Sequence, residues 1–108
     1  MANRKLEPYQ LCAVDVVAQI QKGELTAVPY AQSLLSRIQE RDPIVKAWAY
    51  IDPEYVLEQA RRLDEIALQD RGPLHGVAVA VKDIIFTKGR RPTKDDAERN
   101  ILVLNDYI

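Results

Sequence analysis

The stretch GPLHGVAVAVKD, residues 72–83, decides how the rest of the sequence is interpreted. From Gly76 to Val81 it contains no polar side chain, and the residues after the glycine alternate valine with alanine. Small and β-branched residues without polar interruption are typical of a strand that is buried on both faces of a sheet. The stretch therefore predicts a buried strand over residues 77–82, and such a strand needs neighbours.

Lys82 is the residue in this stretch that points most directly to chemistry. It follows five apolar residues and would stand at the carboxyl end of the buried strand, where α/β folds place their sites. Desolvation disfavours the charged form of a lysine and lowers its pKa, so such a lysine can take a proton near neutral pH. The alternative is a lysine that merely ends a strand and pairs with Asp83. The pattern alone leaves both interpretations open.

Upstream of this stretch, helical spacing of apolar residues predicts three helices, over residues 8–22, 26–41 and 53–70. Their predicted apolar faces are Leu11, Val14, Val17 and Ala18 in the first, Val28, Ala31, Leu35 and Ile38 in the second, and Val56, Ala60, Leu63 and Ala67 in the third. Gly23 is suited to end the first helix, and Thr26 and Asp52 are suited to cap the next two. Glu58 and Arg62 have the favourable i,i+4 spacing for an ion pair.

Between and after these helices the sequence predicts further elements. The Asp42-Pro43 pair predicts a break, and the aromatic and apolar segment 46–51 that follows predicts a short strand. Residues 87–94 form a predicted basic loop, and a short helix is expected over residues 95–106. The fold class predicted is α/β.

Composition limits what the protein can be. Its 108 residues correspond to one domain, and 15 basic against 16 acidic residues give a net charge of −1, which does not favour a strongly basic nucleic-acid binder. No apolar stretch approaches the roughly 20 residues of a membrane-spanning helix. Cys12 is the single cysteine and His75 the single histidine, so we expect a cytoplasmic protein without a metal site, a disulfide or a bound cofactor.

Other polar residues are interpreted mainly as structural. A lone histidine such as His75, in a turn and without a nearby catalytic partner, is more often structural than a general base. Ser33 and Ser36 fall inside the second predicted helix, where they face solvent or pack rather than act as nucleophiles. The basic loop could touch phosphate, but acidic residues follow it directly, and a solvated loop is the better interpretation.

The sequence resembles the amidase signature hydrolases, which cleave carboxamides with a Ser–cis-Ser–Lys triad. The resemblance covers residues 6–87 and is carried by GELT at residues 23–26, by Asp42-Pro43 with KAWAY at 46–50, and above all by residues 72–83. That last stretch is similar to the family's GPLHG(I/V)PV(A/G)(V/I)KD segment and departs mainly at Ala78, where the family usually has proline. Beyond Thr87 two alignments remain: a GMPT-like turn with an insertion near Lys88-Gly89, or a later RP…DA helix start at Arg91-Pro92.

The resemblance implies a role for Lys82 as the family's catalytic lysine, the neutral base that accepts the proton of the cis serine. The family's glycine- and serine-rich segment, with both serines, does not occur in these 108 residues. The resemblance therefore implies an amino-terminal, truncated amidase-like domain over residues 1–108 that is inactive alone. A small-molecule amide would be its substrate once a complementing chain supplied the missing segments.

The second hypothesis is a non-catalytic module that associates with a partner or with another copy of itself. The predicted strand has valines on one face and alanines on the other, so neither face is polar, and little else in a short chain can cover it. We expect a self-associated, partner-bound or marginally folded protein. The exception would be a helix over residues 95–108 that folds back with Ile101 to Leu104 as cover.

Overall fold

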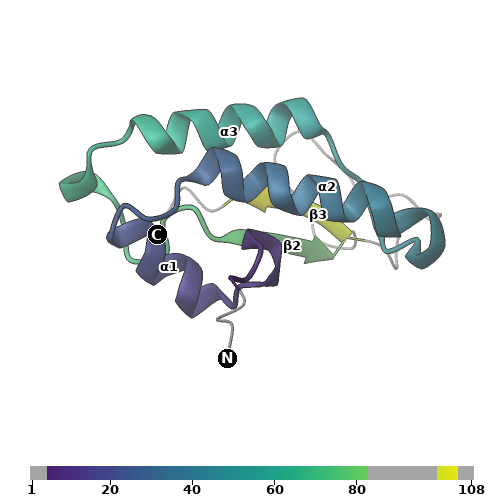
Figure 1. Ribbon diagram of the computed structural model, residues 1–108. Helices are drawn as coiled ribbons and strands as arrows, with labels where there is room; N and C mark the ends of the chain where they lie inside the picture. The colour runs from purple at the N-terminus through teal and green to yellow at the C-terminus, as the bar shows by residue number, and fades with distance from the viewer. Residues whose placement is uncertain (1–4, 83–99, 105–108) are drawn as a thin grey trace.

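The computed structural model describes residues 5–82 and 100–104 as a helix-rich structure with a small sheet (Figure 1). In chain order the elements are η1 (Pro8–Gln10), α1 (Ala13–Gln21), α2 (Ala27–Val45), β1 (Trp48–Tyr50), α3 (Pro53–Glu65), η2 (Leu68–Asp70), β2 (Ala78–Lys82) and β3 (Asn100–Leu104). Helices α2 and α3 pack against each other and run in opposite directions (Figure 1). The basic loop expected at residues 87–94 lies outside the described residues.

The first predicted helix is shorter than expected. A separate 3-10 turn, η1, occupies residues 8–10, and α1 starts only at Ala13. Its buried side chains are Val16 and Ile20, whereas Val14, expected on the apolar face, is 78% exposed. The predicted face is confirmed only in part: Leu11 packs against the buried cluster and Val17 and Ala18 are half-buried, but Val14 is exposed. Gly23 follows the helix end with a positive φ of 76°, as a helix stop requires.

Helix α2 begins after Thr26 as predicted but does not break at Asp42-Pro43. Pro43 lies in the last turn, where its missing N–H removes a single hydrogen bond. The Asp42 carboxylate then closes the helix end, because its Oδ1 accepts hydrogen bonds from the backbone N–H of Ala47 at 2.8 Å and of Trp48 at 3.3 Å. The chain turns through Lys46, with φ of 54°, directly into β1.

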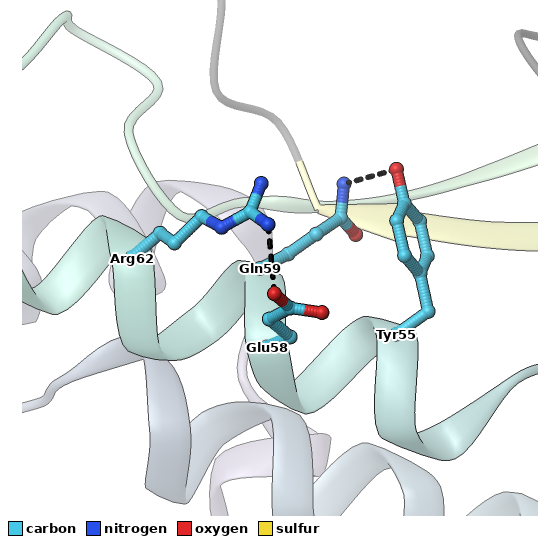
Figure 2. A network of polar contacts seen from close by, with 4 residues as sticks. All are labelled: Tyr55, Glu58, Gln59 and Arg62. Atoms are coloured by element: carbon cyan, nitrogen blue, oxygen red, sulfur yellow. Dashed lines mark hydrogen bonds and ion pairs between the residues drawn. The ribbon is translucent and has the colours of Figure 1, made fainter.

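Helix α3 follows the prediction at its start and ends earlier. The Asp52 carboxylate accepts a hydrogen bond from the Tyr55 N–H, and Pro53 occupies the first turn. The helix ends at Glu65, and η2 takes up the last residues of the predicted range. On the outer face of α3, Arg62 donates to Glu58 at 2.7 Å, as the i,i+4 spacing predicted, and Gln59 donates to the Tyr55 hydroxyl (Figure 2). These contacts mark a solvated face, where an ion pair contributes little to stability.

The sheet has the strand order β1-β3-β2. Strand β3 is parallel to β1 and antiparallel to β2, with Ala80 opposite Leu102 and Lys82 opposite Asn100. The short helix expected over residues 95–106 is therefore wrong for residues 100–104. The segment NILVL contains two β-branched residues, and pairing with both neighbouring strands satisfies its backbone in a way that outweighs its weak helical pattern.

The described core lies between the helices. One buried cluster joins α2 and α3 through Ala27, Ala31, Val56, Ala60 and Leu63, and a second contains Val16, Ile20, Leu25 and Tyr30. Ala78 of β2 packs against both clusters. The next residues of β2 are less covered: Val79 is 40% exposed and Ala80 is also exposed. The strand predicted to be buried on both faces is thus only half-buried at Ala78 and Val81 and exposed at Val79 and Ala80.

Candidate functional site at the end of strand β2

Lys82 is the last residue of β2 and pairs with Asn100 of β3. Its backbone is therefore fixed by the central strand of the sheet, at the carboxyl end of the strand, as the sequence predicted. Asp83, the alternative ion-pair partner, lies outside the described residues. The position of Lys82 depends in part on how the chain enters β2, and several contacts hold that entry.

The turn before β2 packs tightly against α1. Gly76 has a φ of +83°, a backbone conformation that residues other than glycine rarely adopt. A Cβ atom at this position would also lie 2.9 Å from Cδ1 of Ile20, which is itself buried. Glycine at residue 76 therefore allows both the turn and the close approach of α1 to the start of β2.

His75 fixes the same turn to the end of α3. Its side chain is buried, and Nε2 lies 3.0 Å from the carbonyl oxygen of Leu63. Because a carbonyl oxygen only accepts hydrogen bonds, Nε2 carries the proton in this contact. The residue lines a cavity of about 400 Å³ with Ile20, Leu68 and Arg71. This geometry agrees with the structural interpretation of the histidine rather than with a general base.

Asp64 and Arg71 anchor the end of α3 on two sides. The Asp64 carboxylate accepts hydrogen bonds from the backbone N–H of Ala27 at 2.6 Å and of Val28 at 3.0 Å, so it caps the amino terminus of α2. The expected cap, Thr26, makes no such side-chain bond. Arg71 donates through Nε to the Ile66 carbonyl at 2.9 Å. The helix end from which the chain turns toward β2 is thereby held to the start of α2.

Tyr30 links α2 to the first residue of β2. Burial raises the pKa of its phenol above the usual value, while a hydrogen bond with the backbone of Ala78 opposes this shift by favouring the charged form. Together with His75 and Gly76, Tyr30 sets where β2 begins. Lys82 lies only four residues beyond Ala78 along the same strand.

The two serines are not arranged as nucleophiles. The Ser33 hydroxyl accepts a hydrogen bond from the Tyr9 N–H at 3.0 Å and so holds η1 against α2. Ser36 is exposed on the same helix. Over the described ranges, no cluster of three or more histidine, cysteine, aspartate or glutamate side chains could bind a metal ion. In the same ranges, no helix combines the length and apolarity needed to cross a membrane.

Sequence reasoning missed Asp64 and Tyr30. Neither has a local signal, because Asp64 caps a helix that starts 37 residues earlier and Tyr30 contacts a strand 48 residues later. Gly76 did carry a signal, as a glycine between a turn and a strand, but its contact with Ile20 depends on tertiary packing. The residues that position Lys82 are thus mainly long-range partners.

Comparison with known proteins agrees with the geometry. Residues 30–94, more than half of the chain, match the Amidase family profile. Similar curated proteins are named as a subunit of glutamyl-tRNA(Gln) amidotransferase: that of Carboxydothermus hydrogenoformans is 39% identical over 95% of this chain, that of Streptomyces avermitilis 38% over 82%, and that of Streptomyces coelicolor 43% over 74%. These matches cover 21%, 18% and 16% of those proteins, so the chain spans about a fifth of their length. The search of solved structures gave no significant match. By the extent of the profile match, which includes the turn at His75, strand β2 and Lys82, the chain belongs to the amidase family.

Proposed function

We propose that this chain supplies the lysine-bearing segment of an amide hydrolase, with Lys82 as the base of a Ser–cis-Ser–Lys triad. The proposal is carried by the stretch 72–83, which resembles the family's lysine segment and lies within the profile match. Strand β2, inside this stretch, ends at Lys82. The finer assignment of an amidase-signature-like α/β fold, with residues 1–108 as one partial domain, belongs to the same proposal.

The chemistry requires partners for the lysine. A neutral lysine would accept the hydroxyl proton of one serine, which in turn would activate a second serine to attack the carboxamide carbon. Breaking the C–N bond then releases the amine and leaves an acyl-enzyme for water to hydrolyse. The family's glycine- and serine-rich segment does not occur in these 108 residues. A lysine with no positioned hydroxyl has nothing to activate, so these residues alone do not turn over amides.

The relatives give a context for this chemistry. Their names describe one component of an amidotransferase that acts on glutamyl-tRNA(Gln). In our proposal the chain works with a second polypeptide, or with further residues of its own protein, that supplies both serines. The amide consumed would be a small molecule.

An ammonia-release assay on simple amides tests the proposal. We expect no turnover by the purified chain, and turnover when it is combined with the remainder of the Carboxydothermus protein, from which the 105 matching residues have been removed. Lys82→Ala abolishes the restored activity, whereas Lys22→Ala, at an exposed lysine after α1, leaves it unchanged. Equal activity of the Lys82→Ala mixture would refute the role of Lys82.

A second candidate function is a non-catalytic, self-associating module. This candidate is favoured by the exposure of two apolar residues of β2, Val79 and Ala80, because exposed apolar surface promotes association. Light scattering on the purified chain separates the two candidates: a stable oligomer that gains no activity from the added remainder would favour the module.

A further inference from the structure

A groove of about 780 Å³ lies between α2, strand β1 and the start of α3, and Lys82 is not among its lining residues. Seven of its eleven lining residues are apolar: Leu35, Ile38, Pro43, Trp48, Ile51, Pro53 and Leu57. The end of α2 adds exposed apolar side chains beside Pro43, with Ile44 at 76% and Val45 at 58% exposure. These two side chains follow the groove-lining Pro43 in sequence.

The lining of the groove carries little charge. Its one charged lining residue is Asp42, and the Oδ1 atom of that carboxylate already accepts two backbone N–H groups at the start of β1. The remaining lining residues are the neutral Gln32, Ser36 and Gln39. A partner that fills this groove must accordingly be apolar, and a small charged ligand would find no counter-charge there.

One wall of the groove is also a sheet edge. Among the described strands, β1 pairs only with β3, so the backbone groups on its other side have no strand partner. Trp48 belongs both to β1 and to the groove lining. An apolar groove beside an open strand edge suits a folded polypeptide that adds backbone pairing to apolar contact.

We propose that this groove and the free edge of β1 form the docking surface for the remaining four-fifths of an amidase fold. The inference rests on the family assignment that underlies the proposed function and names where the complementing polypeptide binds. All the groove-lining residues, 32–57, lie inside the family match, and the relatives carry the matching stretch within chains about five times as long. In those relatives the same stretch is attached to a large remainder. That remainder is a better occupant than a second copy, because it is the polypeptide that accompanies this stretch in the relatives.

Binding, rather than activity, tests this surface. The tagged chain is produced together with the Carboxydothermus remainder described above, and the complex is measured by light scattering and titration. We expect a one-to-one complex, with slower hydrogen exchange at the backbone amides of residues 49–50, since the Trp48 N–H already donates to Asp42. Gln39→Glu places a carboxylate in the groove and should weaken binding at least tenfold, because the charge loses water on docking. Gln69→Glu makes the same change on exposed η2, outside the groove, and should alter the affinity less than twofold.

The outcomes separate this proposal from the proposed function. A complex that is weakened by Gln39→Glu but has no amidase activity supports the docking surface and refutes the hydrolase. Lys82→Ala should bind as the native chain does. The docking proposal is overturned if no complex forms or if both glutamine variants bind equally. It is also overturned if the chain alone forms a dimer that Gln39→Glu dissociates, because the occupant is then a second copy.

Discussion

The helical half of the molecule and its sheet differ in how completely they are covered. In the helical half, Val16, Ala31 and Ala60 have no exposed surface. In the sheet, Val79 is 40% exposed although its neighbours in sequence are as apolar as any core residue. The helices bury their apolar faces against one another, while β2 has no fully buried residue from Ala78 to Val81 and exposes Val79 and Ala80. The stretch that resembles a catalytic segment thus includes the strand whose apolar side chains are least covered by the described residues.

The two ends of β2 are held by different parts of the molecule. The helices and the turn at residues 73–76 hold the start of β2 through Tyr30, His75 and Gly76. The far end of β2 is held by strand pairing with β3. The helical half therefore holds the start of β2 and strand β3 holds its end at Lys82, so substitutions in each region should separate stability from association.

The largest expected effect is at Leu63 in the helical core. Leu63 is 2% exposed, and truncation to alanine leaves a cavity that costs about 2–5 kcal/mol in the free energy of unfolding. Val79→Ala, on the uncovered strand, should cost about 1 kcal/mol or less. Urea unfolding monitored by circular dichroism measures both. Equal losses would show that β2 is as well packed as the helices and would end the contrast between the two regions.

Two glycines sharpen the comparison at the junction of the regions. Gly23→Ala introduces only the strain of a positive φ, because no atom lies within 4 Å of the added Cβ, and should cost about 1 kcal/mol. Gly76→Ala adds a 2.9 Å contact with Ile20 to the same strain and should cost about 2 kcal/mol. Thermal or urea unfolding of both variants checks this. A Gly76→Ala loss no larger than that of Gly23→Ala would mean that α1 moves aside freely.

Two aspartates test whether a distant cap matters more than a local one. Asp64→Ala removes the carboxylate that accepts two N–H groups of α2 and should cost about 1–2 kcal/mol. Asp52→Ala removes one local bond of 3.2 Å at the start of α3 and should cost about 0.5–1 kcal/mol. Asp64→Asn keeps one acceptor oxygen, so its loss in the free energy of unfolding should lie between those of Asp64→Ala and Asp52→Ala. If Asp52→Ala proved the more damaging in urea unfolding, the link from α3 to α2 would be secondary.

Much of the helical half could be predicted from the sequence, because local signals decide it. The spacing of Ala31, Leu35 and Ile38 identified the inner face of α2, and Asp52-Pro53 marked the start of α3. The break predicted at Pro43 was wrong. A proline in the last turn of a helix removes only one hydrogen bond, and the Asp42 carboxylate closes the helix end two residues later. In α1 the predicted face was wrong at Val14, which is exposed, and it omitted the buried Val16 and Ile20.

The sheet and the surroundings of Lys82 were less predictable for a physical reason. Residues 100–104 have an apolar sequence that fits either a helix or a strand, and only pairing with β1 and β2 decides between them. The resemblance could identify Lys82 as a residue of interest, and helical spacing could not. The groups that position its strand, Asp64 and Tyr30, act across 37 and 48 residues of sequence, beyond any local pattern.

The last prediction concerns the phenol of Tyr30, whose contribution to stability should change only at alkaline pH. Near pH 8, Tyr30→Phe should cost about 1 kcal/mol, because the Ala78 backbone loses a hydrogen-bond partner. The folded pKa of Tyr30 lies above the value of about 10 expected in the unfolded chain, so the contribution of the phenol is fully present below pH 10. As the pH rises further, the unfolded chain loses this proton first, and the native protein loses stability that the phenylalanine variant does not. The other tyrosines are present in both proteins and cancel in the comparison. Urea unfolding at pH 8 and near pH 11 should therefore show the gap between the two proteins narrowing, whereas a constant gap would mean that burial of Tyr30 does not disfavour its charged form.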